Sequence, residues 1–184
     1  MRVLLSLYLV FIGVLALLAQ MILPVHFPFL NIIGFSAALI PLVVVYASLE
    51  LGDMWAVVIA GILGLILDLV SSSHRMGTSP LILCSLSALI VTQAHKRESH
   101  YWLFRLTFVL VGTFGYLLLD YMFILMETMR WSWPLAVWSK IAFASFLNLL
   151  LTPLFFSLVG LPPRLCGWKP SYQQTDRYRA YPYA

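Results

Sequence analysis

Six runs of apolar residues, separated by short polar or proline-containing segments, follow one another along the chain. Most of them have about the length that a helix needs to cross the hydrocarbon core of a bilayer, which is about 20 residues. The runs predict helices over residues 3–23, 32–49, 55–71, 80–93, 102–126 and 135–159. The fourth is the shortest and is rich in small residues, so we expect it to be buried between the others.

The composition is that of a membrane protein. Of the 184 residues, 62% are hydrophobic and 10% are charged, and the mean hydropathy is +0.95, whereas about a quarter of the residues of a soluble domain are charged. We therefore expect an all-α, polytopic integral membrane domain over residues 1–160. Residues 161–184 show no apolar periodicity and are expected to form a flexible, basic cytoplasmic tail.

The basic residues indicate an orientation. The first apolar run is longer than that of a usual signal peptide and no A-x-A cleavage site follows it, so we expect a retained helix. With six spans and both termini in the cytoplasm, three basic residues lie outside, namely Arg75, Arg130 and Lys140. Eight lie inside, namely Arg2, Lys96, Arg97, Arg105, Arg164, Lys169, Arg177 and Arg179. This excess favours that topology, although the inner turn at residues 50–53 has no basic residue.

The stretch from Gly61 to Gly77 combines small residues with a charge inside an apolar helix. Gly61, Gly64 and Asp68 are separated by three and four residues, so they share one helix face. Small residues let another helix approach closely, and an ionisable side chain in a membrane needs a partner or a wet cavity. The glycines are therefore expected to pack a neighbouring helix of the same chain, or alternatively to receive the helix of a partner protein.

Two aspartates, Asp68 and Asp120, are expected in the outer part of the membrane. Lys140 enters from outside to a comparable depth, and Arg75 lies in the adjoining outer loop. Because an unpaired aspartate in lipid costs several kcal/mol, we expect the ion pairs Asp68–Arg75 and Asp120–Lys140. The alternative is that Asp68 binds a proton or a ligand.

No residue pattern indicates catalysis, a cofactor or a metal site. The four histidines are scattered, without H-x-x-x-H or C-x-x-C spacing. Cys84 and Cys166 are expected on opposite sides of the membrane, too far apart for a disulfide. No histidine and carboxylate accompany a serine as in a nucleophilic site, and no basic run interleaves with exposed aromatics as in a nucleic-acid site. We expect neither an enzyme nor a nucleic-acid-binding protein.

The segment Gly61-x-x-Gly64-Leu65-x-x-Asp68-Leu69, followed by Gly77 and an apolar helix, resembles the rod shape-determining protein MreD family. The chain length, the six predicted spans, the scarcity of soluble loops and the short basic tail fit this family as well. The sequence-specific part of the resemblance covers about residues 57–90. The polar turn at residues 71–75 is longer than the family pattern.

The resemblance implies a non-enzymatic component of the bacterial elongasome in the inner membrane. Its expected partner is the membrane helix of MreC, received by a close-packing face that includes Gly61 and Gly64. MreB, a SEDS glycosyltransferase and a penicillin-binding transpeptidase are expected as indirect partners, with membrane lipid around the bundle. The family's fold is similar to the substrate-binding subunit of energy-coupling-factor transporters, a compact six-helix bundle.

Two further functions stay open at this point. The first is a vitamin uptake subunit of an energy-coupling-factor transporter, which would need a polar pocket on the outer side. The second is a proton-coupled channel or carrier that uses Asp68 and Asp120.

Overall fold

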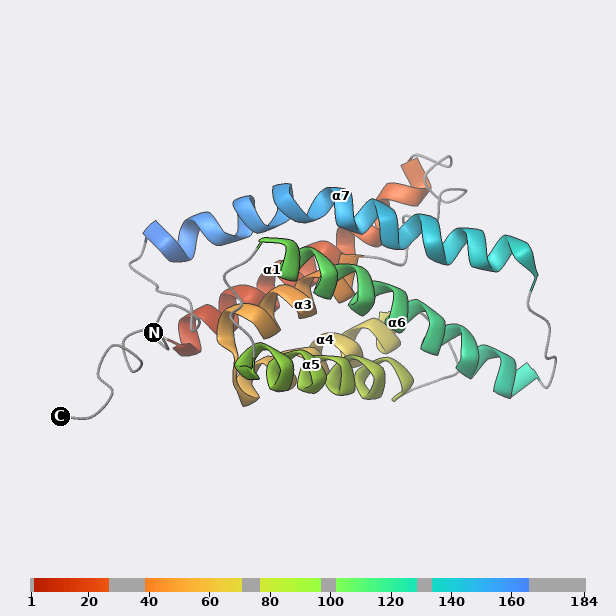
Figure 1. Ribbon diagram of the computed structural model, residues 1–184, viewed down its shortest axis with the longest axis horizontal. Helices are drawn as coiled ribbons and strands as arrows, with labels where there is room; N and C mark the ends of the chain where they lie inside the picture. The colour runs from red at the N-terminus through yellow and green to blue at the C-terminus, as the bar shows by residue number, and fades with distance from the viewer. Residues whose placement is uncertain (1, 27–38, 71–76, 97–101, 129–133, 166–184) are drawn as a thin grey trace.

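The computed structural model describes residues 2–26, 39–70, 77–96, 102–128 and 134–165, and within these ranges the chain is all-helical (Figure 1). The helices are α1 (Arg2–His26), α3 (Leu39–Leu51), α4 (Met54–Val70), α5 (Thr78–Lys96), α6 (Trp102–Thr128) and α7 (Leu135–Leu165). The predicted all-α class is confirmed. Residues 32–38 of the second predicted helix lie outside the described residues.

The helix ends differ from the prediction in two places. α7 continues through Pro162 and Pro163 to Leu165, so the first residues of the predicted tail belong to a helix. Glu50, which the sequence pattern placed in a turn, lies inside α3. The turn itself is made by Gly52, which has a φ of 62° and donates its N–H to the Ser48 carbonyl at 3.1 Å.

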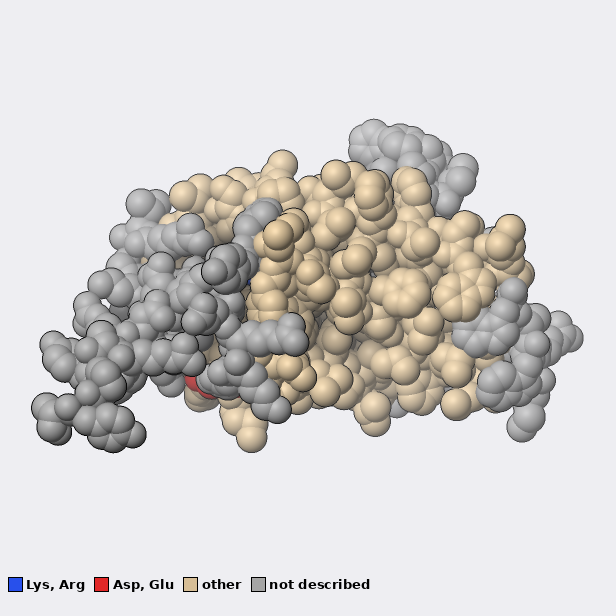
Figure 2. Space-filling view, viewed as in Figure 1, with Lys and Arg blue, Asp and Glu red and all other residues tan. Residues whose placement is uncertain are grey.

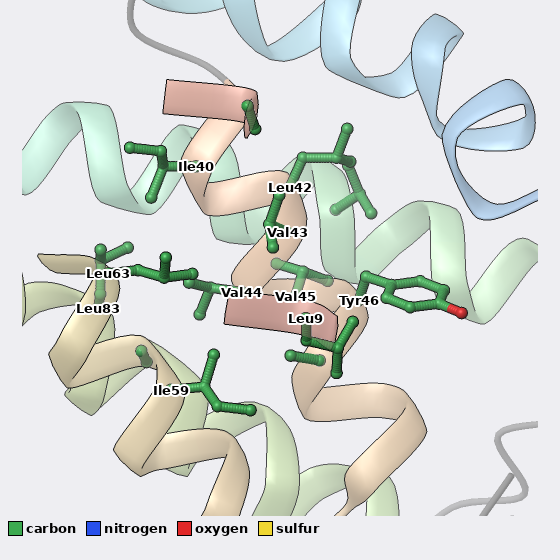
Figure 3. Close-up of a cluster of buried hydrophobic side chains, with 14 of the residues drawn as sticks. Leu9, Ile40, Leu42, Val43, Val44, Val45, Tyr46, Ile59, Leu63 and Leu83 are labelled. Carbon is green, nitrogen blue, oxygen red and sulfur yellow. The ribbon is translucent and has the colours of Figure 1, made fainter. Parts of the chain in front are cut away.

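The helix at the centre of the fold is α3, which packs against α1, α4, α5, α6 and α7. Every residue of α3 after Leu39 is buried. Figure 3 shows the valines and Tyr46 of this helix surrounded by Leu9, Ile59, Leu63 and Leu83 of its neighbours. The expectation that the fourth predicted helix is the buried one is wrong, because α5 exposes large side chains such as Leu81 and Leu89.

The described part of the face seen in Figure 2 is apolar, as expected for a membrane protein. Within the part of the chain that the structure describes, three helices contain stretches that are long and apolar enough to cross a bilayer, namely Val3–Ile22, Leu103–Met126 and Val137–Pro163. Leucines, valines and phenylalanines of these helices are exposed, and the described surface in Figure 2 shows almost no Lys, Arg, Asp or Glu. A continuous apolar surface of this kind is unfavourable in water and favourable in lipid.

Candidate functional site

The two glycines of the distinctive stretch bring α4 and α5 into close contact. A Cβ atom on Gly64 would lie 2.6 Å from the backbone nitrogen of Pro80, which cannot move without moving α5. A Cβ on Gly61 would lie 3.1 Å from Sγ of Cys84, whose thiol also donates to the Val57 carbonyl at 3.5 Å. The structure therefore places both glycines against a helix of the same chain. This placement agrees with the first of the two interpretations of these glycines, and not with the alternative that they receive the helix of a partner protein.

Asp68 joins the end of α4 to the start of α5. Its side chain is only 3% exposed, and its Oδ2 accepts a hydrogen bond from the Gly77 N–H at 2.6 Å. Gly77 has a φ of 102°, in the left-handed region that favours glycine. Its carbonyl accepts the N–H of Leu81 at 3.3 Å, which begins α5. A carboxylate in this position also interacts favourably with the helix dipole of α5.

This arrangement gives a structural role to four residues of the stretch. Gly61 and Gly64 set the close helix contact, Asp68 accepts the backbone hydrogen bond, and Gly77 supplies the backbone conformation that presents its N–H. Together they form a closed helical hairpin. Arg75, the expected partner of Asp68, lies outside the described residues.

A tyrosine of α6 extends this polar region. Tyr116 is buried, its side chain is hydrogen-bonded to that of Ser79 on α5, and both Asp68 and Asp120 lie within electrostatic range of it. We call these four residues, Asp68, Ser79, Tyr116 and Asp120, the Tyr116 cluster. Sequence reasoning missed Ser79 and Tyr116. The sequence contains one indication of Tyr116, which precedes Asp120 by four residues and therefore lies on the same helix face.

The expected pair between Asp120 and Lys140 is not formed. Asp120 is half-buried on α6, whereas Lys140 is exposed near the start of α7 and makes no ion pair with it. A long lysine side chain at a helix end can extend toward the polar boundary of a membrane, which removes the need for a buried partner.

A buried ion pair lies at the opposite end of the bundle. Arg105 Nη1 of α6 is 3.9 Å from Glu50 Oε1 of α3, and the two side chains are 10% and 7% exposed. The guanidinium carbon is 6.0 Å from the ring centroid of Phe156 on α7. That ring meets Tyr46 of α3 edge-on, with centroids 4.9 Å apart. From the sequence, Arg105 was expected among the basic residues on the cytoplasmic side of the membrane. The structure shows that it holds three helices together.

Two further polar contacts connect helices, one inside the apolar core and one at its edge. Ser48 of α3 and Ser87 of α5 are fully buried, and their hydroxyls are 2.8 Å apart. Tyr8 of α1 donates its hydroxyl to the Val159 carbonyl of α7 at 3.2 Å. Pro163 explains the second contact, because it lacks the N–H that would otherwise bond the carbonyl four residues earlier. Such polar contacts stabilise helix packing in membranes.

These polar and charged side chains connect helices to one another. Across the described ranges, no three His, Cys, Asp or Glu side chains gather in a way that could hold a metal ion. The carboxylates of Glu50 and Asp68 are each in contact with a neighbouring helix or its first turn. No protein-family model, curated protein or solved structure matches the chain.

Proposed function

We propose that the chain is a non-enzymatic scaffold of the bacterial elongasome that binds MreC and supports rod shape and lateral peptidoglycan synthesis. The observation that carries this proposal is the α4–α5 hairpin. Its residues Gly61, Gly64, Asp68 and Gly77 are those that resemble the MreD family, and each has a defined role in closing the hairpin. A scaffold protein acts through its shape, so residues that determine how its helices pack are consistent with that role.

The proposed topology has six spans in the inner membrane, with both termini in the cytoplasm. Successive helices run in alternating directions in Figure 1, and the start of α1 lies at the same end of the bundle as the end of α7. The short helix α3 is enclosed by the others, so it needs no full-length contact with lipid. Arg105 is buried, which leaves seven basic residues inside against three outside, and this still favours the same orientation.

The membrane helix of MreC must then contact the outside of the bundle, because α5 already covers the glycines. Exposed apolar faces run along α1, α6 and α7. Van der Waals packing of a single partner helix against such a face is sufficient for association in lipid.

Co-purification from membranes in mild detergent, with mass spectrometry of the co-eluting proteins, tests the proposal. We expect a bitopic coiled-coil protein of the MreC type, together with MreB, a SEDS glycosyltransferase and a penicillin-binding transpeptidase. A Gly64→Leu variant is the control, because a leucine at this position collides with Pro80 and should abolish specific recovery. Absence of these proteins from the wild-type preparation would contradict the proposal.

The vitamin uptake subunit is the second candidate, and the Tyr116 cluster is the observation that favours it. This cluster places two carboxylates, a hydroxyl and a phenol where α4, α5 and α6 meet, at the end proposed to be outside. A substrate-binding subunit needs polar groups on that side. The same co-purification decides between the two functions, since an uptake subunit would bring down a pair of ATPases with a coupling membrane protein.

A further inference from the structure

The hairpin of α4 and α5 is short compared with a bilayer. The apolar stretch of α4, Met54–Val70, has 17 residues, which at 1.5 Å per residue is about 26 Å. That of α5, Thr78–Gln93, is about 24 Å by the same rise. Polar residues bound both stretches in the sequence, since Asp53 precedes the first, residues 71–75 lie between the two, and His95 and Lys96 follow the second. A typical hydrocarbon core is about 30 Å thick.

Two other helices of the bundle are longer, namely α6, which packs against α5, and α7, which packs against α6. The apolar stretches of α6 and α7, Leu103–Met126 and Val137–Pro163, have 24 and 27 residues, or about 36 Å and 40 Å. Figure 1 shows both helices extending beyond α4 and α5 at the right-hand end of the view. Tilt can fit a long helix into a bilayer, whereas it makes the span of a short helix shorter still.

The Tyr116 cluster marks the polar boundary on the short side. Asp68 lies near the end of α4, and Asp120, half-buried on α6, is in electrostatic range of the same tyrosine. α6 continues for about two more turns of apolar residues beyond Asp120. The two aspartates therefore lie at a depth where the longer helix α6 is still apolar. This is expected if the polar boundary of the membrane lies closer to the bilayer centre beside α4 and α5 than beside the longer helices.

We propose that the protein thins the bilayer along its α4–α5 side. The exposed apolar side chains of α4, among them Val58, Ile62, Leu65 and Leu69, contact lipid. Lipid with shorter acyl chains covers this face without exposing the polar ends of the hairpin to hydrocarbon. The proposal requires only that the chain lies in a membrane, so it stands apart from the role in cell-wall synthesis.

Lipid competition at two matched positions tests this proposal. Leu65 on α4 and Leu150 on α7 are 55% and 59% exposed, so a probe at either position should leave the core intact. In the full chain with Cys84→Ala and Cys166→Ala, single variants Leu65→Cys and Leu150→Cys carry an environment-sensitive fluorophore. Each is reconstituted with a brominated eighteen-carbon phosphatidylcholine, which quenches the fluorophore on contact. Unbrominated phosphatidylcholines with fourteen-carbon or twenty-two-carbon chains then compete for the same contact.

At Leu65 we expect the fourteen-carbon lipid to compete about twofold better than the twenty-two-carbon lipid, because mismatch has a modest cost per Å. At Leu150 we expect no such preference. An equal chain-length preference at the two positions would overturn the proposal. Weak quenching at Leu65 by every brominated lipid, together with strong quenching at Leu150, would also overturn it, since the hairpin would then be covered by protein.

Discussion

The carboxylate of Asp68 and the backbone amide of Gly77 close the α4–α5 hairpin through a hydrogen bond of 2.6 Å. Because a charged acceptor shortens and strengthens such a bond, this contact fixes how the two helices meet. The glycines of α4 then lie directly against the first turns of α5. Gly61, Gly64, Asp68 and Gly77 thus determine the contact between α4 and α5.

Substitution of Asp68 should lower stability. Asp68→Ala removes the acceptor for the Gly77 N–H, and we expect a loss of about 1.5–3 kcal/mol in the free energy of unfolding, as for a hydrogen bond to a charged group. Asp68→Asn keeps an acceptor oxygen and should cost less. Detergent-solubilised protein unfolded by SDS titration and followed by circular dichroism gives these values. Equal stability of Asp68→Ala and wild type would refute the structural role of the carboxylate.

Two glycines provide a matched test of the close helix contact. Gly64→Ala places a Cβ against the Pro80 backbone and should destabilise the fold by about 1–3 kcal/mol, the usual cost of overpacking. Gly115 on α6 has no atom within 4 Å of the position of a Cβ. Gly115→Ala should therefore be neutral or stabilising by up to about 1 kcal/mol, because alanine favours a helix. The same SDS titration measures both variants, and a similar loss in the two would show that the contact at Pro80 is unimportant.

The helices, and the shared face of Gly61, Gly64 and Asp68, were predictable from the sequence because both depend on local features. Apolar runs bounded by polar residues define the helices, and the spacing of Gly61, Gly64 and Asp68 places them on one face. The central position of α3 was not predictable in this way. In a membrane, lipid and protein interior are both apolar, so hydrophobic periodicity does not distinguish a lipid-facing surface from a buried one.

The charged contacts were predicted less well because they depend on packing between distant helices. Asp120 and Lys140 lie at similar predicted depths, yet depth alone does not bring two side chains together. Glu50 and Arg105 pair because α3 and α6 are adjacent, and no local pattern indicates that adjacency. The turn after Glu50 contains no basic residue. The positive charge at this end of the bundle comes instead from Arg105 of α6, which pairs with Glu50.

The Glu50–Arg105 pair should show strong energetic coupling. Arg105→Met leaves the Glu50 carboxylate buried without this cation, and we expect a loss of about 3–5 kcal/mol. The double variant Glu50→Gln/Arg105→Met should be more stable than Arg105→Met alone, because the buried charge is removed. A double-mutant cycle on unfolding free energies measures the coupling. Lys140→Met is the control and should change stability by no more than about 0.5 kcal/mol, since Lys140 is exposed and unpaired with Asp120.

Additive effects of Glu50→Gln and Arg105→Met would contradict a direct interaction across α3 and α6. The contact between Arg105 and the Phe156 ring, whose centroid is 6.0 Å from the guanidinium carbon, can be separated from the ion pair by Phe156→Leu, which removes the aromatic ring and keeps an apolar side chain. We expect that variant to be destabilised while the coupling between Glu50 and Arg105 is retained.

The hydrogen bond from Tyr8 to the Val159 carbonyl should depend on the proline four residues after Val159. In the wild type, Tyr8→Phe leaves that carbonyl without its donor, and we expect a loss of about 1–2 kcal/mol in unfolding free energy. Pro163→Ala supplies a backbone N–H that can bond the same carbonyl within α7. In that background Tyr8→Phe should cost clearly less. A cycle of the four proteins, unfolded under identical conditions, measures the difference, and an equal cost of Tyr8→Phe in both backgrounds would show that the proline does not create the need for the tyrosine.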